Sequence, residues 1–212
     1  MTNSSMRLYG LCGILSTFLY MSAYVIGALL RPGYSSISQA TSELLEVGAP
    51  NMLLLGIMIF SFHALLLPFA YGLHKAIDGG KGSKAGPVLL ATAGIMGMVL
   101  TVFFPCDKGC NPVTITGIMH IIIAIPMGFI SVFSILAFSR RLKGNTQWAG
   151  FDKYSMITFV VSILLAIATS FLAKSGYGGF LQRILGVAYM QWWVVMGIAL
   201  IKRSFQKEQI DQ

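Results

Sequence analysis

Six long apolar stretches, almost free of charged residues, constrain the fold of this chain more than any other feature. They run over about residues 8–30, 50–74, 85–105, 114–138, 154–173 and 181–201. A helix needs about 20 apolar residues to cross a bilayer, and backbone groups in lipid must be hydrogen-bonded within a helix or a closed barrel. These stretches lack the alternation of barrel strands. The sequence therefore predicts an all-α membrane protein, a bundle of six transmembrane helices forming one integral membrane domain over residues 1–212.

The composition supports this class. Hydrophobic residues make up 56% of the chain and charged residues 10%, whereas soluble domains carry about 25% charged residues. Soluble globular, disordered and secreted disulfide-rich classes are therefore excluded. The first stretch is longer than the core of a signal peptide and no small-residue cleavage site follows it, so we expect it to be retained as the first span.

The distribution of Lys and Arg predicts the orientation. With a cytoplasmic N-terminus, 11 of these residues fall in inside segments and 4 in outside segments, namely Arg31, Lys108, Lys174 and Arg183. The positive-inside rule then places both termini in the cytoplasm, in a multi-pass protein of the cell (inner or plasma) membrane. The net charge of +8 follows from this bias and faces lipid headgroups. We expect membrane lipids as partners and no nucleic acid; the oligomeric state stays open.

The first outer loop, residues 31–50, shows a helical pattern. Ser36 and Gln39 fit a capping box, and Gly48 with Pro50 would end the helix. Apolar residues recur at helical spacing at Ile37, Ala40, Leu44 and Val47. The pattern predicts a short amphipathic helix at the membrane interface, with Gln39, Glu43 and Glu46 on its polar face. Those carboxylates are either solvated, or Ser42 and Glu43 point into a central vestibule.

The second outer loop contains Cys106 and Cys110, four residues apart on the side expected to be oxidising. A disulfide between them is our preferred prediction. Asp107 lies between the two cysteines. Arg183, at the start of the last stretch, either reaches lipid headgroups or forms an ion pair with Asp107 or Glu43, since an ion embedded in a helix needs a partner.

His63 and His120 lie inside apolar stretches, where ionisable side chains are functional hypotheses by default. Two haem-ligating histidines need similar depths, but His63 lies about 18 Å and His120 about 9 Å from the outer start of its helix. A catalytic zinc ion needs three protein ligands, which the sequence does not offer. We expect neither a metal nor a cofactor. Gly94 and Gly97 predict a close helix contact.

Several short motifs together resemble a known family. They are Ile37-Ser38, Ser42-Glu43 and Pro50 in the first outer loop, then Phe104-Pro-Cys-Asp107, Gly117-x-x-His120 and Gln182-Arg183. The chain resembles domain of unknown function 998, a family of bacterial and archaeal six-helix membrane proteins. A fainter similarity links it to the group that includes DRAM and the FGF-receptor-activating protein. The resemblance implies a cluster on the outer face formed by Ser38, Ser42, Glu43, Asp107, His120, Gln182 and Arg183.

The convergence of polar residues on one face predicts an outward-facing pocket that binds a lipid or small amphiphile. These same seven residues are the candidate ligand-binding set. Two alternatives stay open. One is a small proton-coupled transporter in which His120 relays protons with Glu43 or Asp107. The other is a lipid-directed hydrolase or transferase with Glu43 or Asp107 as general base and His120 as the acid–base partner.

Overall fold

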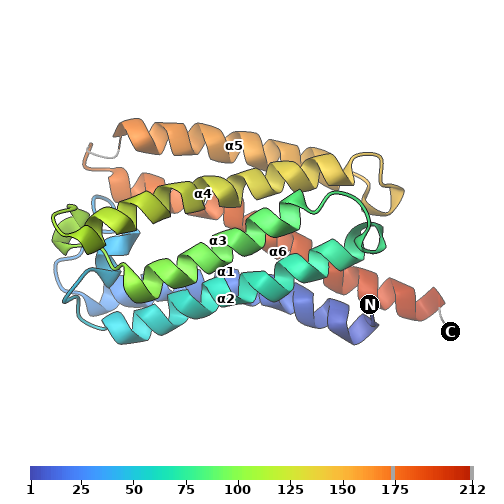
Figure 1. Cartoon of the computed structure of the whole chain (residues 1–212), viewed down its shortest axis with the longest axis horizontal. Helices are drawn as coiled ribbons and strands as arrows, with labels where there is room; N and C mark the ends of the chain where they lie inside the picture. The colour runs from blue at the N-terminus through green and yellow to red at the C-terminus, as the bar shows by residue number, and fades with distance from the viewer. Residues whose placement is uncertain (173–174, 211–212) are drawn as a thin grey trace.

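The computed structural model describes residues 1–172 and 175–210, and within them it holds six long α-helices and no strand (Figure 1). They are α1 (Asn3–Leu30), α2 (Met52–Ala76), α3 (Ala85–Phe103), α4 (Ile115–Leu142), α5 (Phe151–Leu172) and α6 (Gly178–Ile210). All six are long and apolar enough to cross a membrane. The predicted six-helix, all-α membrane fold is confirmed, with ends that shift by up to nine residues; residue 173, the predicted end of the fifth helix, lies outside the described residues.

The helices form a closed ring in chain order. Each packs mainly against its neighbours in the sequence, and α6 returns to pack against α1. The two termini lie at the same end of the bundle (Figure 1), which we refer to as the terminal end. The opposite end, formed by the loops 31–51 and 104–114, is the distal end. That the terminal end faces the cytoplasm stays a prediction.

The main hydrophobic core fills the terminal half of the ring. Its largest fully buried side chains are aromatic: Phe69, Phe138, Trp148, Trp192 and Trp193. Small residues let the helices approach closely, as the sequence predicted for Gly94 and Gly97. A Cβ at Gly94 would lie 2.8 Å from the His63 carbonyl oxygen, and one at Gly97 would clash with the His63 ring. Around the outside, large apolar side chains remain exposed, and in a membrane these contact lipid.

The helix predicted for the first outer loop is shorter than expected and of a different type. A five-residue 3-10 helix, η1 (Thr41–Leu45), forms there in place of an amphipathic α-helix. Leu44 alone of the predicted apolar stripe is fully buried, between α1 and α2 with Ala23 and Leu55, whereas Ile37 and Val47 are each 55% exposed.

Side chains bind the backbone groups that a helix would use for itself. Tyr34 donates a hydrogen bond to the Ala40 carbonyl, and Gln182 accepts one from the Thr41 N–H. The predicted capping box is also displaced, because the Gln39 side chain accepts from the N–H of Ser35 instead of Ser36. These bonds to α6 and within the loop hold the segment in an irregular conformation.

Both terminal helices extend beyond their apolar stretches at the terminal end. The Thr2 side chain caps α1 by accepting from the Ser5 N–H, so α1 begins five residues before the predicted span. Arg7 then donates to the Ser204 hydroxyl at 3.0 Å, forms an ion pair with Glu208 and lies over the Phe205 ring. These contacts with α1 give the polar end of α6 a partner, so α6 continues to Ile210.

Candidate functional site

A cavity of about 540 Å³ lies inside the distal half of the ring. All six helices contribute to its wall, together with η1 and the loop after α3. Along α2 it runs from Met52 to Leu66, a length of about 21 Å at the helical rise. Phe62, Leu66 and Trp193 line its base, and the aromatic core of the terminal half lies below them. The cavity is therefore closed toward the terminal end.

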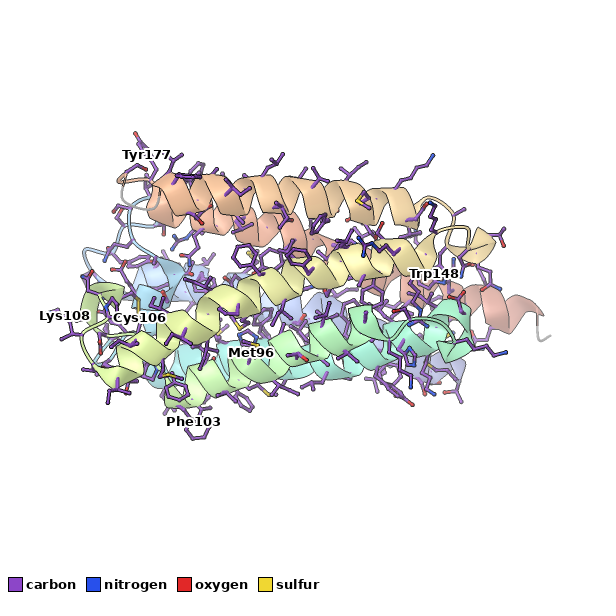
Figure 2. The ribbon with its side chains drawn as sticks, turned by 45° about the horizontal axis from the view of Figure 1, so that its top comes forward. Met96, Phe103, Cys106, Lys108, Trp148 and Tyr177 are labelled. Atoms are coloured by element: carbon purple, nitrogen blue, oxygen red, sulfur yellow. A yellow bond between two sulfur atoms is a disulfide. The ribbon has the colours of Figure 1, made fainter. Side chains whose placement is uncertain are left out.

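The cavity also reaches the side of the bundle. The lining residues that are exposed, Ile125 and Phe129 of α4 and Ser170 of α5, all come from these two neighbouring helices. In Figure 2 the helices α4 and α5 lie close together near the terminal end and diverge toward the distal end, where Cys106 and Lys108 are labelled. A lateral opening between α4 and α5 therefore connects the distal cavity with the lipid-facing surface.

Three of the seven predicted site residues line this cavity: Ser42, His120 and Gln182. His120 Nδ1 lies 2.8 Å from the Phe104 carbonyl oxygen, and Gln182 Oε1 accepts from the Thr41 N–H at 2.8 Å. One polar atom of each side chain thus forms a hydrogen bond with a loop, and the rest of the side chain forms part of the cavity wall. The other four predicted residues, Ser38, Glu43, Asp107 and Arg183, do not line it.

Asp107 organises the loop that leads into α4. Its carboxylate accepts hydrogen bonds from the Val113 N–H, the Thr114 N–H and the Thr114 hydroxyl, at 2.7–2.8 Å. The backbone and side-chain bonds from Thr114, followed by the Val113 bond, hold the pKa of Asp107 below its usual value. A Cβ at Gly117 would clash with this carboxylate. The family motifs around Asp107 and Gly117 therefore meet in space.

Arg183 fastens the first distal loop to α6. Its Nη1 atom donates to the carbonyl oxygens of Ser36, Gln39 and Gly179, and its Nη2 atom donates to the Tyr34 hydroxyl. Within the described residues, Arg183 forms no ion pair with Asp107 or Glu43. The ion-pair alternative is therefore not found, because backbone carbonyls take up the guanidinium donors and Asp107 is held by its own loop.

Glu43 and Glu46, predicted to share a polar face, have different surroundings. Glu43 closes the η1 turn by accepting from the Ala40 N–H and from Gln39 Nε2. Glu46 is 4% exposed; it forms an ion pair with Arg31 at 2.6 Å and accepts from the Gly109 N–H at 2.6 Å. Glu46 therefore links the two distal loops. This role was not predicted, because helical spacing favoured a solvated position for Glu46.

Cys106 and Cys110 have their sulfur atoms at disulfide distance, in agreement with the predicted bond. The pair packs on η1: the Val47 N–H donates to the Cys106 carbonyl at 2.9 Å, and the Ser42 hydroxyl oxygen lies 3.1 Å from Cys110 Sγ. Ser38 is exposed and bonds only through its backbone N–H to Ser35 among the described residues. Most of the motif residues thus assemble a cap of loops over the cavity.

The aromatic part of the polar wall was not predicted from the sequence. Tyr20 and Tyr24 of α1 and Tyr189 and Trp193 of α6 line the cavity, and so does His63 of α2, which the sequence had marked as a functional candidate. The tyrosines at positions 20 and 24 stand four residues apart, a spacing that puts both on one helix face. Apart from that spacing, the sequence held no signal that separates these aromatic residues from ordinary core residues.

These features define a multi-pass six-helix membrane protein with a capped distal cavity. The chain matches the family model described as "Protein of unknown function (DUF998)" over residues 14–199 and belongs to this family. The resemblance drawn from the motifs is thereby confirmed, while the fainter similarity to the DRAM group receives no support. No curated protein and no solved structure matches the chain.

Proposed function

We propose that this protein binds a lipid or small amphiphile in the distal cavity. The observation that carries the proposal is the shape and lining of that cavity. It is closed at its base, covered by the cap of loops at the distal end, open between α4 and α5, and mostly apolar with polar groups that include Ser42, His120 and Gln182 near the cap. Ligand sites typically have volumes of about 300–1,000 Å³ and this kind of lining.

The arrangement suits an amphiphile from the surrounding bilayer. The apolar walls, formed by residues such as Ile59, Leu100 and Ile121, would bury a hydrocarbon chain. The polar groups of Ser42, His120 and Gln182 lie at the end where a head group would remain. The lateral opening offers a route for a chain that never leaves the hydrophobic phase, which avoids the cost of exposing it to water.

Transport and catalysis have less support from the same residues. A permeation path would have to pass the buried aromatic side chains of Phe69, Phe138 and Trp192. For lipid-directed hydrolysis or transfer, the predicted bases Glu43 and Asp107 are each engaged by neighbouring backbone N–H groups. Binding is therefore the function that we propose.

Native mass spectrometry of the protein purified from its membrane tests this proposal. A Cβ at Gly56 or at Gly128 would meet no atom within 4 Å, and both glycines line the cavity. Gly56→Leu and Gly128→Leu should therefore each place a side chain in the cavity and reduce the space for a hydrocarbon chain. We expect a retained lipid adduct in the wild type and its loss in both variants.

Ile167→Phe is the matched control, because Ile167 is 48% exposed and lies outside the lining, next to the lining residue Ala166. This variant should retain the adduct. An adduct kept equally by all four proteins, or absent from the wild type, would contradict binding in the cavity.

A further inference from the structure

We infer that the ligand head group recognised at the cap is uncharged and carries a hydroxyl group, as in a long-chain alcohol or a monoacylglycerol. This inference rests on the proposed function and narrows it to one chemical class. Two independent observations support it. The charged side chains of the distal end are engaged by other protein groups, and His120 and Gln182 each keep one hydrogen-bonding atom that the cap does not use.

The charged side chains near the cavity are engaged elsewhere. Asp107 and Glu43 accept backbone N–H groups of their own loops, Glu46 and Arg31 pair with each other, and Arg183 donates to carbonyl oxygens. Lys108 is exposed at the distal tip (Figure 2). Among the described residues, no lining residue is Asp, Glu, Lys or Arg. A charged head group placed in this wall would lose water without gaining a counter-ion, which is strongly unfavourable.

The free atoms of the cap favour a group that both donates and accepts. A carbonyl oxygen only accepts, so the neutral His120 ring carries its proton on Nδ1, toward Phe104, and Nε2 remains an acceptor. The Thr41 N–H occupies Gln182 Oε1, which leaves the amide Nε2 as a donor. A hydroxyl group can donate to His120 and accept from Gln182. A carboxylate or an ether cannot donate, and a quaternary ammonium can do neither.

The depth of the cavity sets the chain length of a useful probe. From Gln182 at the cap to Trp193 at the base, α6 rises about 16 Å, which is comparable to a chain of eleven carbons. Trp193 lines the cavity, whereas Trp148 and Trp192 do not. A bromine atom at the end of such a chain would therefore reach Trp193 and quench its fluorescence.

The experiment compares four probes of equal chain length in detergent solution at about pH 8, where a carboxylic acid is ionised. They are 11-bromoundecanol, its methyl ether, 11-bromoundecanoate and the 11-bromoundecyl trimethylammonium ion. We expect the alcohol to quench with a Kd about tenfold lower than that of the ether, the size expected for one hydrogen bond. The two charged probes should bind at least tenfold more weakly than the alcohol.

Two variants connect the signal to the named residues. Trp193→Phe should abolish the quenching by the alcohol, because it removes the reporter at the base. In His120→Phe the ratio of the Kd of the ether to the Kd of the alcohol should fall to about one, because only the alcohol donates a hydrogen bond to His120. This ratio is independent of the fraction of folded protein, and the wild-type comparison stands if His120→Phe does not fold.

The outcomes separate the two proposals. If no probe quenches the wild type, or if Trp193→Phe is quenched as strongly, binding in the cavity fails and the inference fails with it. If the carboxylate, the ammonium ion or the ether binds as tightly as the alcohol, the cavity binds amphiphiles but the hydroxyl-specific inference is overturned. Tight binding of the alcohol alone, with loss of the preference in His120→Phe, supports both.

Discussion

At the scale of single residues, the ion pair between Glu46 and Arg31 joins the two loops of the cap. Its side chains are 5% and 19% exposed, and Glu46 also accepts the Gly109 N–H from the second loop. Removing one partner of a buried pair leaves the other charge uncompensated. The alternatives open from the sequence for Arg183 included an ion pair with Asp107 or Glu43, but the charged pair of the cap is Glu46 with Arg31.

A double-mutant cycle tests this pair. Glu46→Ala and Arg31→Met should each lower the free energy of unfolding by about 3 kcal/mol, measured by equilibrium unfolding in mixed detergent. The double variant should lose clearly less than the sum of the two single changes. Strictly additive losses would show that the two charges act independently. Lys108→Ala, a change at an exposed charge in the second loop, serves as the neutral control.

Asp107 gives a prediction about pH. Its pKa in the folded protein lies below the ordinary value because three hydrogen bonds favour the carboxylate. Its contribution to stability is therefore fully present above the unfolded pKa of about 4 and is lost as the pH falls through the lower folded pKa. Asp107→Asn should melt at a lower temperature than the wild type near neutral pH.

The difference in Tm between wild type and Asp107→Asn should shrink as the pH is lowered below about 4. Thermal melts in detergent at a series of pH values measure it. A difference that stays constant across the acidic range would mean that the carboxylate charge contributes nothing to the folded loop.

At the scale of elements, glycines decide how closely neighbouring helices pack. A Cβ at Gly97 of α3 would clash with the His63 ring of α2, whereas one at Gly56 of α2 would meet open space. On a lone helix, Ala is favoured over Gly by about 0.5–1 kcal/mol. Only the neighbouring helix distinguishes the two positions.

Gly97→Ala should therefore destabilise the protein by about 1–3 kcal/mol, the usual cost of overpacking a contact. Gly56→Ala should be neutral or stabilising by less than about 1 kcal/mol. Unfolding of both variants beside the wild type, in the same detergent, gives the comparison. If the two variants behave alike, the tight approach of α2 and α3 at His63 is not required for stability.

Arginine side chains hold the connecting loops at both ends of the bundle. At the distal end Arg183 donates to carbonyls of the first loop. At the terminal end Arg141, near the end of α4, donates to the carbonyls of His74, Ile77 and Ser83 and so fastens the glycine-rich connection between α2 and α3. The guanidinium group suits this role because its several fixed donors can satisfy several carbonyls at once.

At the scale of the whole molecule, six crossings bring both termini to one end of the bundle (Figure 1). The Lys and Arg distribution predicts that this end lies in the cytoplasm. Green fluorescent protein fused to either terminus should therefore fluoresce, and alkaline phosphatase fused to either terminus should be inactive. Active phosphatase at either terminus would overturn the predicted orientation, and a split result would contradict the even number of crossings.

The class of fold follows from the sequence alone. Backbone groups in lipid must be hydrogen-bonded within a helix or a closed barrel, and apolar stretches of about 20 residues without the alternation of barrel strands leave the helix. Local spacing also favoured the pairing of Cys106 with Cys110, because the two cysteines are four positions apart with a glycine between them. The sequence also located the polar residues at one end of the bundle. They lie in loops or at helix ends, and the alternating direction of the six spans brings these to the same end.

Only the tertiary structure decided what those polar residues do. Asp107, Glu43 and Arg183 hold loops together, while Ser42, His120 and Gln182 line the cavity. The spacing of residues 36–47 predicted a helix, but Leu44 inserts between α1 and α2 and the α6 side chains bind the loop backbone instead. Hydrogen-bond partners from distant segments outweigh local propensity, because a backbone group engaged by another element is no longer available to its own turn.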